Sequence, residues 1–478
     1  MAQSKHFYLT TTLPYVNAEP HVGFAMEIIR ADSIARYHEA CGEKVFFNTG
    51  TDEHGQKIYQ NAGAAGKDTQ AYVDIFAERF RGLQPLLGLK SDLNFIRTTD
   101  AHHVAAAQEF WKKCEASGDI YKKNYSIKYC VGCELEKTDS ELVDGKCPIH
   151  PSLTIESINE ENYFFRFSKY QSALLELYNN NPTFVVPEWR LTEVKKFVAA
   201  GLEDFSISRL KTKMPWGVPV PGDDTHVMYV WFDALVNYIS AIGWPIDMQQ
   251  FESWWPVVQV AGKDNLRQQS AMWQAMLMSV GIAPSKQIVI GGFITGAGGM
   301  KMSKSLGNVI NPYDIVKDYG TDALRYFVLR EIQPFEDSPF TVDLFKAAYN
   351  ANLANGIGNL LSRVMKLVET HVTEKIVFPE YEHPKEYVDA FAAFELHKAM
   401  NLVWKSIGEC DQTMQTTRPF ELVKTDKAAA QKVLTELVVK LGEIAFLLRP
   451  FLPDTAHKIE ESIEGQQMPK GPLFLRKE

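Results

Sequence analysis

The sequence lacks the long apolar runs that characterise membrane proteins. No uninterrupted apolar stretch in its 478 residues approaches the roughly 20 residues that a membrane-spanning helix needs. Residues 1–6 have neither the apolar core of a signal peptide nor the arginine-rich composition of a transit peptide. We therefore expect a protein that begins near Met1, acts in the cytosol and does not bind membranes.

Cysteine and net charge are scarce as well. Six cysteines in a chain of this length, with no secretory signal, do not indicate a disulfide scaffold. The formal net charge of -9 argues against binding nucleic acid through overall charge, but it allows a local basic face. Hydrophobic residues make up 45% of the chain, which is enough for large cores, and the length suggests roughly three domains.

Buried strands are present in two separate groups. Four segments have the aromatic and β-branched composition of such strands: residues 5–13, 43–50, 257–264 and 287–293. Residues 25–41 have small and apolar residues at helical spacing, and Gly42 follows as a plausible cap, while residues 266–281 form a second helical pattern. A strand, a helix and a second strand in close succession are typical of a parallel sheet.

The distribution of these elements predicts the domain order. The two groups of strands are far apart, and after about residue 338 only long helical patterns follow. We predict an α/β protein with a Rossmann-like parallel sheet that an insertion splits, followed by an α-helical bundle. The expected ranges are 1–115 and 222–337 for the halves of the sheet domain, 116–221 for the insertion and 338–478 for the bundle.

The insertion contains four residues with the spacing of metal ligands. Two residues lie between Cys130 and Cys133, and Cys147 and His150 repeat that spacing a short way on. Four such ligands suit tetrahedral zinc and close its coordination sphere, so the ion would be structural. A redox CxxC motif and chance are the alternatives, and the second pair favours zinc. The other cysteines have no such neighbours and are expected to be ordinary buried residues: Cys41, Cys114 and Cys410.

A glycine-rich loop carries two lysines three residues apart. Lys301 and Lys304 follow three glycines, and the loop comes after a predicted strand, at the carboxyl edge of the sheet. Ligands bind at that edge in parallel sheets, and two ammonium groups there can clamp a phosphate. A solvated surface loop is the alternative interpretation.

These motifs resemble those of a known family. "PHVGF" (20–24) and "KMSKS" (301–305) resemble the two signature motifs of class I aminoacyl-tRNA synthetases. Over nearly the whole chain, further segments resemble the methionyl-tRNA synthetases: "TTTLPYVNAEPHVG", "TGTDEHGQKI", "CVGC", "GLEDFSISR", "VWFDALVNY" and "GKDNLR". The resemblance implies that the protein makes methionyl-adenylate from methionine and MgATP, then transfers the methionyl group to tRNA(Met), releasing pyrophosphate and AMP.

The resemblance also implies site residues for both small substrates. The implied ATP site, of which His21 and the two lysines are the catalytic residues, is His21, Gly23, Phe24, Asp264, Lys301 and Lys304. Asp52 would receive the ammonium group of methionine, with a helix cap as its alternative role. Aromatic rings suit a thioether, although each ring alone is also typical of a core. The implied methionine pocket is Leu13, Tyr15, Asp52, Trp231, Ala234, Tyr238, Gln269 and Trp273.

Cofactors and the tRNA site follow from the same resemblance. One structural zinc ion is implied, and Mg²⁺ enters with ATP. Asn359 and Arg363 lie four residues apart on one helix face and match anticodon-reading positions. Phe420 is either a third anticodon residue, which would stack on a base, or part of the bundle core. The chain stops soon after the bundle, so we expect a monomer.

Three histidines of the family are replaced here. Phe24, Gln269 and Gly291 stand in their places. Loss of a transition-state donor typically costs about 3 kcal/mol, so a catalytically inactive relative that still binds tRNA is one hypothesis. We favour an active subtype, because His21, Asp52 and the other implied catalytic residues are present. A class I synthetase for another amino acid and a non-enzymatic zinc protein that binds RNA are further alternatives.

Overall fold

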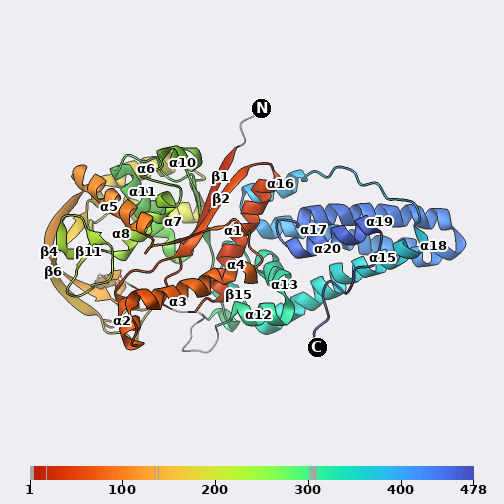
Figure 1. Cartoon of the computed structure of the whole chain (residues 1–478), viewed down its shortest axis with the longest axis horizontal. Helices are drawn as coiled ribbons and strands as arrows, with labels where there is room; N and C mark the ends of the chain where they lie inside the picture. Colours follow the sequence, from red (N-terminus) through yellow and green to blue (C-terminus); the bar gives the residue numbers. More distant parts are fainter. Residues whose placement is uncertain (1–4, 18, 134, 138, 301, 303–308) are drawn as a thin grey trace. The chain divides into compact units, whose positions relative to one another are not determined.

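The structure is a computed structural model of the chain, and it describes residues 5–17, 19–133, 135–137, 139–300, 302 and 309–478. Two compact units divide the chain (Figure 1). The first unit contains residues 1–20, 44–83 and 92–290, and the second contains residues 21–43, 84–91 and 291–478. Among the described residues, no helix is both long enough and apolar enough to cross a membrane.

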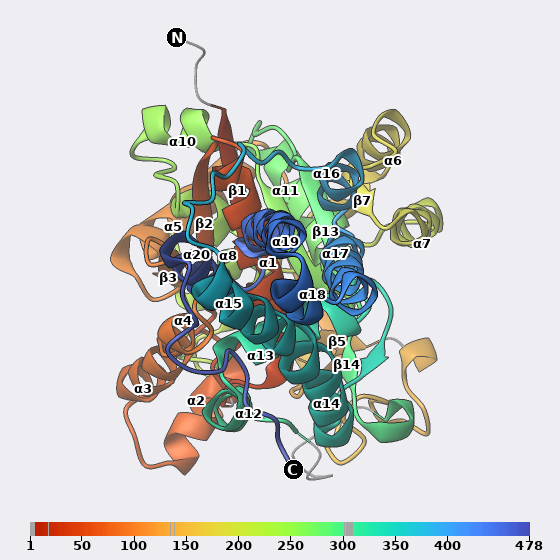
Figure 2. The same ribbon diagram turned by 90° about the vertical axis from the view of Figure 1, so that its right-hand side faces the viewer.

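A six-stranded sheet forms the centre of the first unit, in the order β3-β2-β1-β12-β13-β7 (Figure 2). The pairs β3–β2, β2–β1, β1–β12 and β13–β7 are parallel. This confirms the α/β fold with a parallel sheet. The strands are β1 (His6–Thr11), β2 (Lys44–Thr51), β3 (Asn94–Arg97), β7 (Val185–Val186), β12 (Val258–Gly262) and β13 (Gln287–Gly291).

The four predicted strands are central in this sheet, and the two strands that sequence reasoning missed are its edges. In β1, Leu9 is fully buried and lies opposite Phe47 on one side and Val258 on the other. Central parallel strands are covered on both faces, which explains their continuous apolar runs. The missed strands, β3 and β7, have four and two residues, too few to show a pattern.

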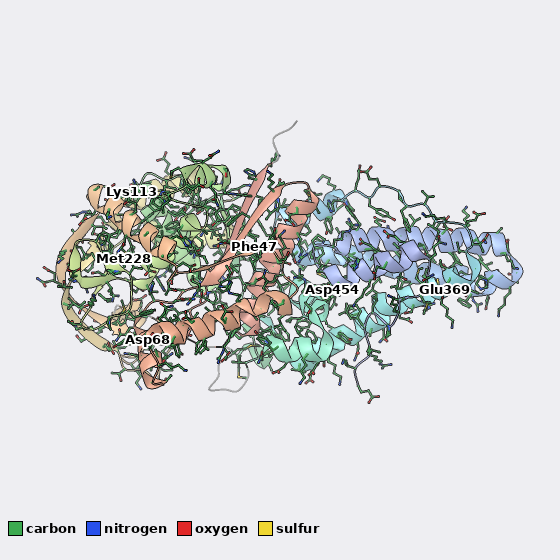
Figure 3. The ribbon with its side chains drawn as sticks, in the orientation of Figure 1. Phe47, Asp68, Lys113, Met228, Glu369 and Asp454 are labelled. Carbon is green, nitrogen blue, oxygen red and sulfur yellow. The ribbon has the colours of Figure 1, made fainter. Side chains whose placement is uncertain are left out.

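Helices of the first unit enclose an aromatic core. Phe110 stacks on Trp273 with ring centroids 5.7 Å apart, and both rings are fully buried. Figure 3 labels the buried Phe47 and the exposed Lys113. The helices are α2 (Gln56–Ala64), α3 (Thr69–Arg81), α5 (Ala101–Ala116), α6 (Gln171–Asn180), α7 (Glu188–Ala199), α8 (Val230–Ala234), α9 (Asn237–Ser240), α10 (Met248–Trp254) and α11 (Trp273–Ser279), with a π-helical segment, η4 (Gln268–Met272), before α11.

Two small antiparallel sheets complete the first unit. One has the order β5-β4-β6-β8 and the other β10-β11-β9. Strand β4 ends at Cys130, so the first cysteine pair lies on the turn that leads to β5. The strands are β4 (Ile120–Cys130), β5 (Leu135–Lys137), β6 (Glu156–Phe165), β8 (Phe205–Ser206), β9 (Ser208–Leu210), β10 (Pro219–Val220) and β11 (Asp223–Met228).

The second unit is mainly helical, as the sequence predicts. Helices α15, α17, α18, α19 and α20 pack side by side (Figures 1 and 2). A two-stranded parallel pair joins β14 (Ile294–Thr295) to β15 (Ser338–Pro339). The helices are α1 (Val22–Ala40), α4 (Leu83–Leu86, which starts at the unit boundary), α12 (Pro312–Tyr319), α13 (Thr321–Tyr326), α14 (Val342–Ala348), α15 (Asn359–His371), α16 (Lys385–Ala392), α17 (Leu396–Thr417), α18 (Pro419–Thr425), α19 (Lys427–Leu448) and α20 (Pro453–Gly465).

A buried ion pair fixes α1 within the second unit. Arg325 of α13 lies 2.8 Å from Asp32 of α1, and both side chains are fully buried. The same guanidinium donates to the carbonyl oxygens of Leu87, Pro450 and Phe451. A buried charge is tolerated only when it is paired and hydrogen-bonded, so this contact specifies how α1 packs against the end of the helical bundle.

Candidate active site and metal centre

The loop after β1 and the residue after β2 pair at the carboxyl edge of the sheet. Tyr15 and Asp52 form a parallel bridge. The Asp52 N–H donates to the carbonyl of Pro14 at 2.9 Å, and its carbonyl accepts from the N–H of Val16 at 3.1 Å. These bonds bring Leu13, Tyr15 and Asp52 together, with the Asp52 side chain only 7% exposed.

A second group of predicted pocket residues meets around Tyr238. Its ring lies edge-on to the fully buried Trp273, with centroids 5.9 Å apart. Its hydroxyl accepts a hydrogen bond from Gln269 Nε2 at 2.8 Å. Its carbonyl accepts one from the Tyr8 hydroxyl at 2.8 Å, which ties α9 to β1. Gln269 itself lies on the π-helical segment, a distortion that is frequent at functional sites.

A chain of amide groups supports Ala234, another predicted pocket residue. Asn94 Nδ2 donates to Asn48 Oδ1 at 2.7 Å, and Asn48 Nδ2 donates to Asn237 Oδ1 at 3.2 Å. Asn237 Nδ2 then donates to the carbonyl of Ala234 at 2.6 Å. Strands β3 and β2 thereby fix the end of α8. Trp231, one turn earlier on α8, is partly exposed, with its ring centroid 5.9 Å from that of Tyr229.

The structure adds a buried pair that sequence reasoning missed. His54 Nδ1 lies 3.0 Å from Asp233 Oδ2, and their side chains are 6% and 0% exposed. Burial raises the pKa of the Asp233 carboxyl, while the His54 ring opposes that rise. The pair connects the segment that follows Asp52 to α8. Both residues belong to quoted motifs, "TGTDEHGQKI" and "VWFDALVNY", but no sequence signal joins positions so far apart.

A second buried histidine lies near this pair. His103 is fully buried, and its Nδ1 lies 3.0 Å from the Ser240 hydroxyl. Burial lowers the pKa of His103 to about 3, so its ring is neutral at physiological pH. Asp264, the predicted ribose ligand, lies in a short 3-10 segment (Lys263–Asn265) after β12 and is exposed. Asn265 Nδ2 donates to its carboxylate at 3.2 Å.

In the second unit, His21 caps the N-terminus of α1. Its Nδ1 accepts the backbone N–H of Gly23 at 3.1 Å, and its ring lies 4.4 Å from the ring of Phe24. A Cβ atom at position 23 would lie 2.8 Å from the His21 Cε1 atom, so glycine makes room for the imidazole. The N–H of Val22 donates to the carbonyl of Ile310, beyond the lysine loop. Lys301 and Lys304 lie outside the described residues, and Gly291 ends β13.

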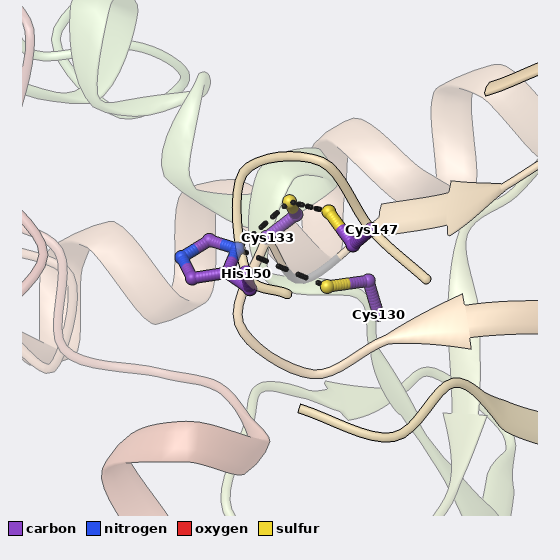
Figure 4. Close-up of side chains that lie close together, drawn as sticks. All are labelled: Cys130, Cys133, Cys147 and His150. Atoms are coloured by element: carbon purple, nitrogen blue, oxygen red, sulfur yellow. Dashed lines mark hydrogen bonds between the residues drawn. The ribbon is translucent and has the colours of Figure 1, made fainter. Parts of the chain in front are cut away.

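The four predicted metal ligands converge (Figure 4). Their ligand atoms all lie within 4.8 Å of one another. Cys133 Sγ is 3.4 Å from Cys147 Sγ and 3.2 Å from His150 Nδ1, and Cys130 Sγ is 3.9 Å from His150 Nδ1. Sulfur and nitrogen atoms on a tetrahedral zinc ion have comparable separations, because each lies only about 2.0 to 2.3 Å from the metal. The donor set fits zinc.

The predicted anticodon residues lie on two helices of the second unit. Asn359 opens α15 and is exposed, and Arg363 Nη1 lies 3.3 Å from Asp411 Oδ1 of α17. The Phe420 ring on α18 is 40% exposed, with the Arg418 guanidinium carbon 5.7 Å from its centroid. An exposure of this size disagrees with the bundle-core alternative for Phe420.

Comparison with known proteins identifies the family. The family model described as "tRNA synthetases class I (M)" matches residues 7–154 and 152–365. A methionine–tRNA ligase of Thermotoga maritima is 39% identical over 482 residues, covering 97% of this chain and 76% of that protein. A chloroplastic/mitochondrial methionine–tRNA ligase of Arabidopsis thaliana is 41% identical over 473 residues, covering 94% of this chain and 76% of that protein.

Solved structures agree with these relatives. The structure of Mycobacterium tuberculosis methionyl-tRNA synthetase in complex with methionyl-adenylate matches with a TM-score of 0.89 and 37% identity, covering 96% of this chain and 93% of that chain. The apo form of the same enzyme matches with a TM-score of 0.84 and 32% identity, covering 100% of this chain and 99% of that chain. The protein therefore belongs to the family of class I tRNA synthetases of the methionine (M) type.

Proposed function

We propose that this protein ligates methionine to tRNA(Met) in an ATP-dependent reaction. Its relatives are named methionine–tRNA ligases, and one matching structure holds methionyl-adenylate. The observation in this chain that supports the proposal best is the meeting of a buried carboxylate, Asp52, with Tyr15 at one sheet edge, and of Tyr238 with Trp273 in the same unit. A carboxylate suits an ammonium group, and aromatic rings suit a thioether.

In the first step, the methionine carboxylate attacks the α-phosphorus of ATP in line, a P–O bond breaks and pyrophosphate leaves. Asp52 holds the methionine ammonium group, and the aromatic residues hold the side chain. Lys301 and Lys304 stabilise the charge that moves to pyrophosphate. His21 lies at a helix N-terminus, which favours phosphate oxygens. Positioning and charge stabilisation therefore supply most of the rate.

In the second step, a hydroxyl of the terminal ribose of tRNA attacks the carbonyl carbon of methionyl-adenylate. The bond to the phosphate oxygen breaks, AMP leaves and the proton of the hydroxyl is lost. Asp264 binds the adenosine ribose, as the exposed end of β12 allows. Mg²⁺ accompanies ATP and neutralises part of its phosphate charge when bound. Asn359, Arg363 and Phe420 read the anticodon, which their accessible positions support.

We also propose that the Cys130–His150 cluster holds one structural zinc ion. Three thiolates and one imidazole complete a tetrahedral set without an open position, so the ion orders the turns after β4 and takes no part in the reaction. Gly132 supports the fit, because a Cβ atom there would lie 2.5 Å from the His150 ring. Three expectations stay predictions: the cytosolic location, the monomeric state and the four domain ranges. Light scattering would check the monomeric state, and limited proteolysis would check the domain ranges.

Methionine-dependent ATP–pyrophosphate exchange tests the proposed activity directly. We expect exchange with methionine that a Lys301→Ala variant loses, and charging of tRNA(Met) by the wild-type chain. Exchange no greater than that of the variant would contradict the proposal and favour a relative that binds tRNA without catalysis. Exchange with another amino acid but not with methionine would favour a synthetase of different specificity.

A further inference from the structure

A buried chain of amide and hydroxyl groups runs through the first unit and ends at Tyr238. Gln274 Nε2 donates to Ser285 Oγ at 3.1 Å, and Ser285 Oγ donates to Gln259 Oε1 at 2.8 Å. Gln259 Nε2 donates to Gln269 Oε1 at 3.0 Å, and Gln269 Nε2 donates to Tyr238 Oη at 2.8 Å. None of the five side chains belongs to a residue more than 5% exposed.

The direction of this chain is fixed at its far end. Gln274 Oε1 accepts the backbone N–H of Ser285 at 2.9 Å, and Gln274 Nε2 donates to the backbone carbonyl of Gln269 at 2.7 Å. An N–H cannot accept and a carbonyl cannot donate, so the Gln274 amide cannot be turned round. Its nitrogen therefore also faces Ser285 Oγ. The serine oxygen has two lone pairs and could accept from Gln259 as well, but the buried serine proton would then lose its acceptor, Gln259 Oε1 at 2.8 Å. Satisfying that proton favours the arrangement in which Ser285 donates to Gln259.

The direction of donation in each later amide follows from the bond before it. With its oxygen committed to Ser285, Gln259 presents its nitrogen to Gln269 Oε1, and Gln269 presents its nitrogen to Tyr238 Oη. An amide nitrogen has no lone pair to accept the tyrosine proton. The Tyr238 hydroxyl is thus an acceptor toward Gln269, and its own proton is directed away from that residue.

We propose that Gln259 and Ser285 are positioning residues for methionine selectivity, acting through Gln269 to hold the Tyr238 hydroxyl as a hydrogen-bond donor toward the methionine sulfur. This inference rests on the proposed function. A thioether sulfur is a weak acceptor, whereas the methylene group of norleucine accepts nothing, so a fixed donor separates two side chains of similar shape. Because amides do not titrate, this selectivity is independent of pH.

Substitutions at Gln259 change the chain in two distinct ways. Leucine at 259 removes both of its bonds and lets Gln269 turn its oxygen toward Tyr238, which then receives the tyrosine proton. An ionised glutamate at 259 has only acceptors, so it forces Gln269 to turn, whereas a protonated glutamate can replace the glutamine donor. Burial raises the pKa of carboxyl groups, so the Gln259→Glu variant is expected to switch with pH.

The test compares kcat/KM for methionine with kcat/KM for norleucine in ATP–pyrophosphate exchange. We expect Gln259→Leu to lower the methionine preference about three- to tenfold, the range of one neutral hydrogen bond. In a Tyr238→Phe background, Gln259→Leu should have no further effect on the preference. Gln259→Glu should keep a preference close to that of the wild type at low pH and lose it as pH rises, while the wild-type preference stays constant.

A matched control removes a buried serine hydroxyl outside the chain. Ser279 Oγ donates to Asp119 Oδ2 at 2.8 Å, and neither residue belongs to the predicted pocket or to the chain that ends at Tyr238. Ser279→Ala should lower the melting temperature without changing the methionine preference. If Gln259→Leu does not fold, Ser285→Ala breaks the same chain with a smaller loss of volume, and it should lower the preference in the same direction.

The outcomes separate this inference from the proposed function. A wild-type chain that does not activate methionine would end the proposed function. A wild-type chain that activates methionine, with folded Gln259→Leu or Ser285→Ala variants whose preference stays within twofold of wild type, would overturn only the role of the amide chain. An equal loss of preference in Ser279→Ala would also overturn it, because a general loss of stability would then explain the effect.

Discussion

The metal centre and the methionine pocket of the first unit are built in opposite ways. The four metal ligands lie between positions 130 and 150, on turns that follow β4, and their ligand atoms meet within 4.8 Å. The pocket instead collects residues between Leu13 and Trp273 along the chain. Hydrogen-bonded chains from β2, β3 and β12 fix those residues in place.

The metal centre is specified by residues that are close together in the sequence, whereas the pocket is specified by residues that are far apart. Spacing alone defines the metal centre, because short turns bring neighbouring residues together whatever the rest of the chain does. The pocket depends on the sheet order, since Tyr15 meets Asp52 at the ends of β1 and β2, and Gln259 reaches Gln269 from β12. The two sites should therefore respond differently to substitution: the metal centre by losing its ion, and the pocket by losing affinity and selectivity.

Loss of the metal has the largest expected effect. Cys147→Ala removes one of four ligands, and binding of structural zinc to such sites is worth about 10 kcal/mol. We expect wild-type protein to contain one zinc ion per chain and the variant to contain none, with faster hydrogen exchange in residues 128–153. Elemental analysis and exchange mass spectrometry measure both. Cys41→Ala is the control, and a Cys147→Ala variant that retains its full zinc content would contradict the assignment.

Removal of the pocket carboxylate has the next largest effect. Asp52→Asn keeps the shape of the side chain but removes the charge that receives the ammonium group. A charge-assisted hydrogen bond is worth about 1.5–3 kcal/mol, so kcat/KM for methionine should fall about 10- to 100-fold. The KM for ATP should change little. Steady-state exchange kinetics measure both parameters, and a loss confined to the KM for ATP would place Asp52 in a different role.

The His54–Asp233 pair should make stability depend on pH. Burial raises the pKa of Asp233, so the folded state holds its proton more tightly than the unfolded chain does. The associated stability is fully present below the ordinary carboxyl pKa and is lost as pH rises through the raised value, at up to about 1.4 kcal/mol per pH unit. In Asp233→Asn this loss should be absent. Urea unfolding of both proteins from pH 4 to 7 measures the difference.

An exposed carboxylate provides the control for that experiment. Asp224 is solvent-exposed, and Asp224→Asn should unfold with the same pH dependence as the wild type. If the free energies of unfolding of wild type and Asp233→Asn run parallel across the whole range, the Asp233 carboxyl does not govern the pH dependence.

The helix cap of the second unit gives the smallest expected effect. In Gly23→Ala the new methyl group would lie 2.8 Å from the His21 ring, so the ring must leave the N-terminus of α1. Loss of a cap typically costs about 1 kcal/mol of stability, so we expect the melting temperature to fall by about 2–4 °C and exchange to slow as the His21 ring moves. In a His21→Ala background the same substitution should have no further effect. Additive losses would show that Gly23 acts independently of the imidazole.

Sequence reasoning predicted the central strands, the helical second unit and the metal centre, and it missed features without a local signal. Strands β3 and β7 are too short to show a pattern and owe their pairing to neighbours. His54 and Asp233 stood inside recognised motifs, yet nothing in the sequence relates one to the other. Gly23 was predicted as part of the ATP site, and the structure shows that a glycine there leaves room for the His21 ring.

By itself, the sequence determined what depends on neighbours along the chain: the β1 and β2 runs, the helical pattern of α1 and the two pairs of metal ligands. Apolar periodicity, capping and ligand spacing involve residues close together along the chain, so they can be recognised directly in the sequence. Only the tertiary structure decided which way the Gln269 amide faces, because that direction is fixed by Gln274 and transmitted through Ser285 and Gln259. Hydrogen-bond direction depends on every partner at once, and the sheet assembles those partners from distant parts of the chain.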